Sequence, residues 1–497
     1  MAASSNQDEM HKPLRIFVIL GVVALALGLM ALLAHTSSSR KALQNYKAEL
    51  RAKGEKLSYT ELQPFAQVNI SDSLIAFTNA MERISYSRLT PGNLEFRKFI
   101  GPGQALALWK QDTPFGIGSG KGGFAADWEE FTAEIEKYRA PLEEVRDALK
   151  DPRLVCSTRT GVWERPLPNF ITIRKCAQWL AGATVSDLHE GNTDQALQDI
   201  EAMAAVARIN RDDCTLVSQM IRIAVANLGV AATWEVLQST NWTEPQLARL
   251  QKAWESVELE KALERGIVGE RAGGDEIWRV VRHESRGKIR NLLNFGGSTN
   301  TTFRDLAQDY VLLPLYRLTS MDEDELFRLK VMQSYIDTAR AVRAHHPWSD
   351  AKQYQDRGTA ELNRVASAPF ASRYWLSMIS IPNFTRANQS GVRGETEWQM
   401  TIAAVALQRF KLRHGEFPES LETLQPEFLS TVPYDCFSGK ALCYKRKPDG
   451  GYLLYSVGED GKDDGGDASA AGKFGIWEGK DAVWPGTPEI QTNLTAK

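Results

Sequence analysis

The stretch "IRKCAQWLAGATVSDLHEGNTDQALQDIEAMAAVAR", residues 173–208, decides the fold. Its small and apolar side chains recur at steps of three and four residues, which is the period of one face of an α-helix. Gly191 interrupts the pattern as a helix C-cap would, and Thr193 follows at a position that suits an N-cap. Because so short a turn forces adjacent helices to run antiparallel, the stretch predicts a helical hairpin.

This hairpin is one part of a longer helical region. Apolar periodicity continues through residues 166–394 and predicts an array of antiparallel helices. Residues 215–237 are apolar almost all round, so we expect that helix to be buried. "EGNTDQAL" resembles the turn of tetratricopeptide-type hairpins, but no strict 34-residue period follows, which favours an array over a repeat protein. Residues 36–165 contain several prolines and predict a mixture of helices and loops.

The N-terminal region contains an uncharged apolar run, "IFVILGVVALALGLMALLA", from Ile16 to Ala34. At ~1.5 Å per residue this run spans roughly 28 Å, close to the hydrocarbon thickness of a bilayer. We therefore predict a transmembrane anchor over residues 14–35, after a short tail of residues 1–13. The alternative is a cleaved signal peptide, but such peptides usually have a shorter apolar stretch, and no A-x-A cleavage site follows.

Composition limits the class of protein. The 497 residues include 59 basic and 62 acidic side chains, and this balance lacks the basic excess of a nucleic-acid-binding protein. Five cysteines without a C-x-x-C pair do not define a disulfide scaffold or a zinc site. Cys436 and Cys443 flank a turn, and the sequence leaves open whether they form a disulfide or remain free thiols.

The pattern changes over residues 395–485. A helix ends at Gly415, and two strand-like runs, "LCYKRK" and "GYLLYSV", follow around the turn "PDGG". A helix that leads into a small antiparallel sheet is typical of an α+β module, and we expect residues 486–497 to form a flexible tail. The predicted fold class is mainly α, with a transmembrane helix, a helical array and this C-terminal module.

An acidic loop ends the second strand-like run. "YSVGEDGKDDGGD", residues 455–467, contains five acidic side chains and four glycines. Calcium takes six to eight oxygen ligands, and such a loop supplies carboxylates together with backbone carbonyls. The spacing is not that of an EF-hand. From composition alone, a solvated Asp-Gly turn is the simpler interpretation.

Residues 395–485 resemble the C-terminal domain of the type II secretion major pseudopilin. The matching points are His414-Gly415, Phe417-Pro418, the D-x-F-S-G-K turn at Asp435–Lys440, "LYSVGEDG" at 454–461, and a late aspartate, Asp481. In that family the loop binds a structural calcium ion. The resemblance implies Ca²⁺ here, with Asp460 and Asp481 as the main side-chain ligands and Ser456 assisting. Asp463, Asp464 and Asp467 lie in a segment of variable length and are secondary candidates.

The rest of the chain departs from that family. It lacks the "G-F-T-x-x-E" processing signal, and some 350 mostly helical residues separate the apolar run from the module. A pilin subunit needs its apolar helix to continue directly into its head, so we do not expect this chain to assemble as a pilin. The whole arrangement also resembles uncharacterised bacterial membrane-anchored proteins, a likeness that implies architecture but no activity.

These observations predict a non-enzymatic envelope protein, in which a helical array binds protein partners of a secretion or pilus-like system. The resemblance implies the bacterial inner membrane, a single membrane pass and a periplasmic C-terminal part. The count of basic residues favours the opposite orientation, since two precede the span and five follow it: Lys12, Arg15, Arg40, Lys41, Lys47, Arg51 and Lys53. We expect the periplasmic orientation.

The alternative function is a membrane-tethered hydrolase with its active site in a helical groove near Glu270. Asp275 could supply the second carboxylate of such a site. Other catalytic motifs are incomplete. "HESRG" at 283–287 has glycine where a zinc-binding H-E-x-x-H motif needs its second histidine, and "GIGSGKGG" lacks residues of a P-loop.

Overall fold

The computed structural model describes residues 5–62, 71–85, 107, 115–117, 124–152, 154, 170–284, 289, 311–381, 384–469 and 476–484, with the backbone alone for residues 5–18, 85, 115–117, 124–126 and 478. The predicted C-terminal tail, residues 486–497, lies outside this part of the chain. The chain divides into two compact units. The first unit comprises Met1–Leu62, Arg271–Gln333 and Gly358–Pro382, and the second unit comprises Gln63–Glu270, Ser334–Arg357 and Asn383–Lys497.

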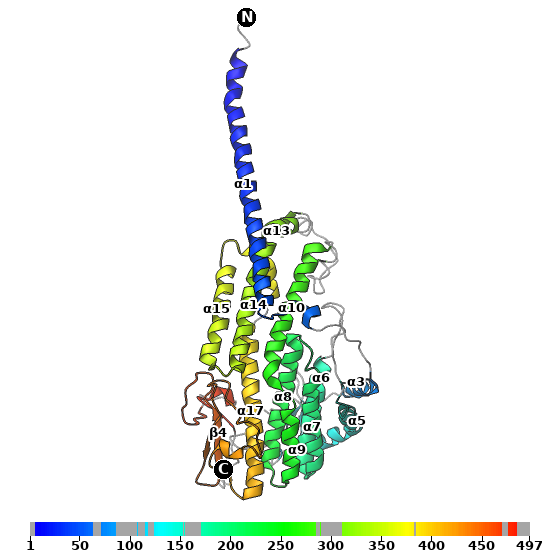
Figure 1. Cartoon of the computed structure of the whole chain (residues 1–497). Coiled ribbons are helices and arrows are strands. Elements are labelled where there is room, and N and C mark those ends of the chain that lie inside the picture. Colours follow the sequence, from blue (N-terminus) through cyan, green and yellow to red (C-terminus); the bar gives the residue numbers. More distant parts are fainter. Residues whose placement is uncertain are drawn as a thin grey trace. The chain divides into compact units, whose positions relative to one another are not determined.

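The protein is mainly helical, as predicted, with one small antiparallel sheet of three strands. Figure 1 labels most of the elements along the chain. The longer helices are α1 (Ser5–Ala52), α3 (Asp72–Ser85), α4 (Trp128–Lys137), α5 (Arg139–Leu149), α6 (Phe170–Glu190), α7 (Thr193–Arg208), α8 (Leu216–Gln238), α9 (Glu244–Glu255), α10 (Ala262–His283), α14 (Met321–Arg343), α15 (Trp348–Ala366) and α17 (Phe384–His414). Short helical segments are α2 (Tyr59–Leu62), α13 (Leu313–Thr319), η4 (Ala371–Tyr374) and α16 (Trp375–Ser380). A two-stranded hairpin, β1 (Phe115–Ile117) with β2 (Phe124–Ala126), precedes α4.

In the first unit, α1 begins at Ser5 and ends at Ala52, so it extends well beyond the predicted anchor in both directions. The predicted N-terminal tail is therefore helical from residue 5. The helix ends two residues before Gly54, which adopts a left-handed conformation with φ +81°. Leu43 and Leu50 on its C-terminal half are buried, whereas the apolar residues from Ile19 to Leu33, except the half-buried Leu32, are exposed.

In the second unit, the predicted hairpin is present as α6 and α7. Gly191 has φ +81° and ends α6, but Asn192 rather than Thr193 occupies the N-cap position of α7. Helices α7, α8 and α9 pack beside one another, and α17 packs against α8 and α9 (Figure 1). The near-uniformly apolar α8 is largely buried, as expected from its sequence.

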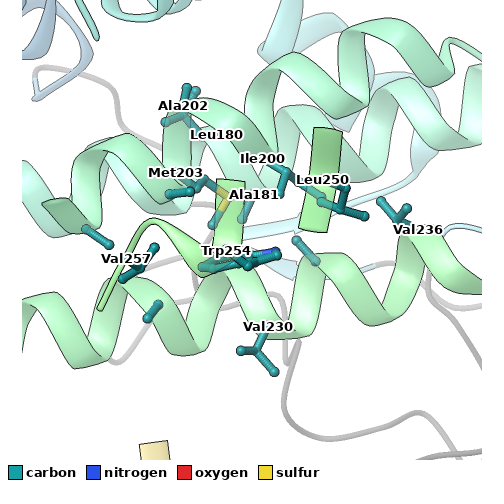
Figure 2. Packing of buried hydrophobic residues seen from close by; sticks show 14 of the residues in the cluster. Leu180, Ala181, Ile200, Ala202, Met203, Val230, Val236, Leu250, Trp254 and Val257 are labelled. Carbon is teal, nitrogen blue, oxygen red and sulfur yellow. The ribbon is translucent and has the colours of Figure 1, made fainter. Parts of the chain in front are cut away.

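The core of the second unit forms around Trp254 of α9. Figure 2 shows its indole among Leu180, Met203, Val230 and other apolar side chains from four helices. Gly229 of α8 permits this packing, since a Cβ atom there would lie 2.1 Å from the Trp254 ring. The indole N–H donates to Thr233 Oγ1 at 2.8 Å, so the one polar atom of the ring is satisfied inside the core.

The C-terminal module has the predicted α+β character. Its strands are β3 (Cys443–Arg446), β4 (Tyr452–Ser456) and β5 (Ala482–Val483), paired antiparallel in the order β3-β4-β5. The helix before the sheet, α17, begins at Phe384 and continues through the predicted boundary at residue 395. Its buried apolar residues, including Ala403, Val405 and Leu407, belong to the same core as Trp254. The module therefore shares one hydrophobic core with the helices of the second unit.

Candidate functional site

The acidic loop is held between two paired strands. Ser456 at the end of β4 pairs with Ala482 at the start of β5. The loop leaves β4 at Val457, and Asp481 immediately precedes β5. Strand pairing therefore brings Asp481 to the base of the loop, although it is 14 residues from the loop's end at Asp467 in the sequence.

Asp481 is completely buried and closes the loop through its carboxylate. Oδ2 accepts the backbone N–H groups of Gly466 at 2.7 Å and Asp467 at 3.2 Å, and Oδ1 accepts that of Asp464 at 3.4 Å. The N–H of Asp481 donates in turn to the carbonyl of Asp467 at 3.1 Å. Burying a carboxylate is costly unless several donors satisfy it, and here the donors are main-chain amides of the loop itself.

A second buried carboxylate, Asp435, holds the other end of the loop. Oδ1 accepts the hydroxyl of Ser456 at 2.6 Å and the N–H of Phe437 at 2.9 Å, and Oδ2 accepts the N–H of Val457 at 3.2 Å. The Ser456 oxygen then accepts the N–H of Gly458 at 3.2 Å. Sequence reasoning noted the turn at Asp435–Lys440 but gave Asp435 no role in the site. Its signal is the spacing D-x-F-S-G-K, which ties the turn to β4.

The remaining predicted ligands lie on the outside of the loop. Asp460, Asp463 and Asp464 are exposed, and Asp467 is half-buried. Asp460, Asp463 and Asp467 each accept the backbone N–H two residues further on, which is the contact of an Asx turn. The pKa of Asp463 is lowered by the Gly465 amide and the Tyr455 hydroxyl, and that of Asp467 is lowered by Ser469 and Lys480.

The donor chemistry of the loop fits calcium, because its side chains offer oxygen alone. These side chains do not direct their carboxylates toward one common point. In the part of the chain that the structure describes, no three His, Cys, Asp or Glu side chains gather closely enough to hold a metal ion. Asp481 and Ser456 face the base of the loop, whereas the carboxylates of Asp460, Asp463 and Asp467 satisfy local amides. A cation at this place would compete with backbone amides for Asp481.

The two cysteines beside this module are free thiols. Cys436 is buried and Cys443 is half-buried, and burial raises the pKa of both thiols. A raised pKa disfavours the reactive thiolate form.

The patch around Glu270 is occupied by structural contacts. Glu270 Oε1 accepts the N–H of Leu216 at 3.1 Å, so this carboxylate caps the start of α8. Asp275, five residues further along α10, accepts Lys47 Nζ at 3.1 Å within the first unit. Arg271 is fully buried and donates to Glu55 at 2.7 Å and to the carbonyl of Lys56 at 3.0 Å. The two carboxylates proposed for hydrolysis therefore have separate partners.

An acidic segment at the start of α14, Asp322–Glu325, forms a cluster that sequence reasoning did not single out. Its cationic and hydroxyl partners come from five other elements of the first unit: Arg40 and Lys47 on α1, Arg282 on α10, Tyr316 on α13, Arg373 and Tyr374 on η4, and Ser377 on α16. Arg282 alone bridges Asp322 at 2.7 Å and Glu325 at 2.6 Å. Four consecutive acidic residues in "MDEDELF" are the signal that could have pointed to it.

Asp324 is the most buried member of this segment. Its carboxylate accepts the Tyr316 hydroxyl at 2.6 Å and the N–H groups of Leu376 at 3.0 Å and Ser377 at 3.2 Å, and the Ser377 hydroxyl also donates to it. Burial raises the pKa of Asp324 to about 6 despite these donors. The segment thus joins α13 and α16 to α14.

Another buried carboxyl, Glu395 of α17, was also not anticipated. It lines a small hollow with Glu260, Glu264 and Arg343, and the Tyr434 hydroxyl donates to it. Burial raises the pKa of Glu395 to about 7, and the Tyr434 hydrogen bond opposes this shift. Because Arg340 and Arg343 are engaged with Glu264, at 2.6 Å and 3.0 Å, the hollow is braced by internal ion pairs.

Comparisons of the chain with models of protein families, with curated proteins and with solved structures gave no match. The roles assigned to these residues therefore rest on their contacts.

Proposed function

We propose that this protein is a single-pass membrane protein that acts as a non-enzymatic scaffold in the bacterial envelope. Helix α1 anchors it, the helical array of the second unit binds protein partners, and the C-terminal module serves as a pseudopilin-like head. The proposal includes a bacterial inner-membrane location with the large part of the chain in the periplasm.

The exposure of α1 carries this proposal. Between Ile19 and Leu33 the large apolar side chains other than the half-buried Leu32 are about half exposed or more, reaching 75 % at Leu25, and they point to all sides of the helix. Figure 1 shows this blue part of α1 extending past α13, without another described element of its unit beside it. An apolar surface of this kind is unfavourable in water and matches the hydrocarbon of a bilayer. The other long apolar helix, α8, differs because 61 % of its most apolar stretch is buried inside the protein.

The head includes the proposed calcium site. Its support is the all-oxygen donor set of the loop, the burial of Asp481 at its base, and the resemblance to the pseudopilin domain. Asp481 and Asp460 would be the main side-chain ligands, with Ser456, Asp463, Asp464 and Asp467 nearby. Bound calcium would supply positive charge to a loop that now relies on amides.

Membrane fractionation of the full chain tests the anchor. We expect the protein to stay in the membrane pellet after alkaline carbonate extraction. A variant with Leu25→Arg and Leu29→Arg should move to the supernatant, because each arginine at the centre of a span costs about 2.5–3.5 kcal/mol. As a matched control, Ala48→Arg and Ala52→Arg add the same charge to exposed positions beyond the apolar run. Release of the unaltered protein by carbonate would overturn the proposal.

Thermal melting tests the metal. A site at calcium concentrations of ~100 times Kd stabilises the native state by about 2.7 kcal/mol. We expect calcium to raise the melting temperature and EDTA to reverse the shift, with Asp460→Ala weakening the response. An unchanged melting curve in calcium and EDTA would remove calcium from the proposal but leave the anchor intact.

Cross-linking of the membrane-bound protein, followed by identification of its neighbours, tests the scaffold role. We expect other envelope proteins to be captured through residues of the second unit. Capture of the cross-linked protein alone, at native expression, would argue against a scaffold.

A further inference from the structure

Helix α13 of the first unit has an inverted distribution of polar and apolar side chains. Its sequence with the two preceding residues is "VLLPLYRLT", residues 311–319. Arg317 points into the protein, where it donates to the carbonyls of Val281 at 2.6 Å and Glu284 at 2.8 Å at the end of α10. Tyr316 also points inward, with its hydroxyl on Asp324 and its ring against Trp375. The polar side chains Tyr316 and Arg317 therefore lie on the side of α13 that faces the protein.

The opposite side of α13 is apolar and exposed. Val311, Leu312, Leu315 and Leu318 have exposed fractions of 60 %, 58 %, 52 % and 58 %. Their spacing is that of one helical stripe, in which residues three and four apart are neighbours. Soluble proteins show the reverse pattern, with the apolar stripe toward the core and the polar side chains in water.

Helix α13 is followed directly by α14, whose first turn pairs with α1 just beyond the apolar run, through Glu323 with His35 and Asp322 with Arg40. Helix α13 packs against α1 within the first unit (Figure 1). The first polar residue after the run is His35, whose Nε2 lies 2.7 Å from a guanidinium nitrogen of Arg373. Phe370, three residues before Arg373, is 70 % exposed, and Ile379 on α16 is 57 % exposed. The exposed apolar surface of α1 therefore continues into its neighbours.

We propose that Val311, Leu312, Leu315, Leu318, Phe370 and Ile379 form a lipid-contacting seat that inserts into the interface of the bilayer spanned by α1. This inference rests on the proposed membrane anchor and adds a second mode of attachment to it. An apolar stripe that lies in the headgroup region stabilises attachment in proportion to its buried area. Lys41, next to this level, is exposed and can lie near lipid phosphates, whereas the neighbouring Arg40 pairs with Asp322.

Site-directed spin labelling of the full chain in nanodiscs of phosphatidylethanolamine and phosphatidylglycerol tests the seat. Cys156→Ser and Cys443→Ser supply the background, since Cys176, Cys214 and Cys436 are buried. Labels are attached at Leu315→Cys, Leu25→Cys and Ala52→Cys in separate samples. Ala52 is exposed on the same helix but about 28 Å beyond Leu33, at ~1.5 Å per residue. Collision with oxygen, which concentrates in lipid, is compared with collision with a water-soluble nickel complex.

We expect the oxygen-to-nickel collision ratio at 315 to exceed that at 52 several-fold and to approach that at 25. A label at 315 that collides with nickel as readily as the one at 52 would overturn the seat, while a lipid-exposed label at 25 would preserve the anchor. A label at 315 that meets neither reagent would show that a protein covers the stripe and would also overturn the seat. Nickel access at 25 would refute the anchor itself.

Discussion

The acidic loop of residues 459–467 and the acidic segment Asp322–Glu325 carry similar negative charge but have different partners. In the loop, main-chain amides satisfy the buried Asp481, and the aspartates of the loop mostly accept their own turn amides. In the segment, Arg40, Lys47 and Arg282 come from two other helices to bind the carboxylates. The base of the loop is thus held by main-chain amides, although Glu459 pairs with Arg393 and Asp467 with Lys480 at its rim. The segment is held mainly by side chains from other elements.

This difference shows what a run of acidic residues does and does not reveal. Glycines between aspartates let the backbone turn its N–H groups toward a carboxylate, so the loop can close without cations. The acidic segment lies in the first turn of α14 and cannot fold its own backbone around its carboxylates. Its donors therefore come from other elements, as cationic side chains and as the N–H groups of Leu376 and Ser377. Composition alone does not distinguish the two cases.

The largest expected effect is the loss of the Asp481 carboxylate. Asp481→Ala removes a buried carboxylate and leaves three part-buried backbone amides without their acceptor, and we expect the second unit to lose about 3–5 kcal/mol of unfolding free energy. Urea denaturation in the presence of EDTA measures it. As the matched control, Asp460→Ala removes an exposed carboxylate and should cost less than about 0.5 kcal/mol. Equal losses in the two variants would show that amides at the base do not hold the loop.

The two regions should also respond to pH with opposite sign. Burial raises the pKa of Asp324 from 3.8 to about 6. The stabilisation that Asp324 gives to the folded state is therefore complete below pH 3.8 and is lost as the pH rises through 6. The shift corresponds to about 3 kcal/mol as an upper limit. The lowered pKa values of Asp463 and Asp467 have the reverse consequence, because their contribution is present above pH 3.8 and is lost on acidification.

Hydrogen exchange read peptide by peptide separates these responses. As the pH rises from 4 to 6, α16 should lose protection against hydrogen exchange, after correction for the intrinsic exchange rate. Residues 459–467 should keep their protection. Asp324→Asn should abolish the pH dependence of α16. A parallel response of α16 and the loop would contradict the assignment of Asp324.

Much of the helical architecture could be predicted from the sequence, because local rules govern it. The period of apolar residues around Trp179 and Ile200 placed α6 and α7, and the uniform hydrophobicity of residues 215–237 predicted a buried α8. The strands at Cys443 and Tyr452 followed from short apolar runs and a turn. The start of α17 at Phe384 was missed, because the sequence change at residue 395 marks a new packing environment rather than the start of a helix.

The site was only partly predictable, since its contacts join residues far apart in the chain. The acidic loop was recognised from its composition, and Asp481 from the resemblance to a pseudopilin. That amides rather than other carboxylates face Asp481 depends on backbone conformation, including φ +86° at Gly466. Tyr316 lies eight residues from Asp324, but the arginine and lysine partners of Asp322–Glu325 lie 40 to 282 residues away, beyond any local pattern.

A smaller effect is expected from the removal of Lys47, a cation that binds the acidic segment Asp322–Glu325. Burial alone would lower the pKa of Lys47, but the carboxylates of Glu325 and Asp275 outweigh it and raise this pKa. Lys47→Met keeps most of the side-chain volume and removes the charge, so we expect a loss of about 2 kcal/mol. The Glu325→Gln exchange combined with Lys47→Met should recover part of that loss in a double-mutant cycle. Strict additivity would mean that the two groups do not interact.

The smallest effect is expected from the corresponding cation of the loop. Lys462 Nζ lies 4.0 Å from Asp460 Oδ2, and its side chain is 78 % exposed. An ion pair at this distance in water contributes little, so Lys462→Met should change the unfolding free energy by less than about 0.5 kcal/mol. Denaturation of this variant beside Lys47→Met measures the contrast directly. A loss at Lys462 as large as that at Lys47 would mean that the loop, like the segment, depends on side-chain cations.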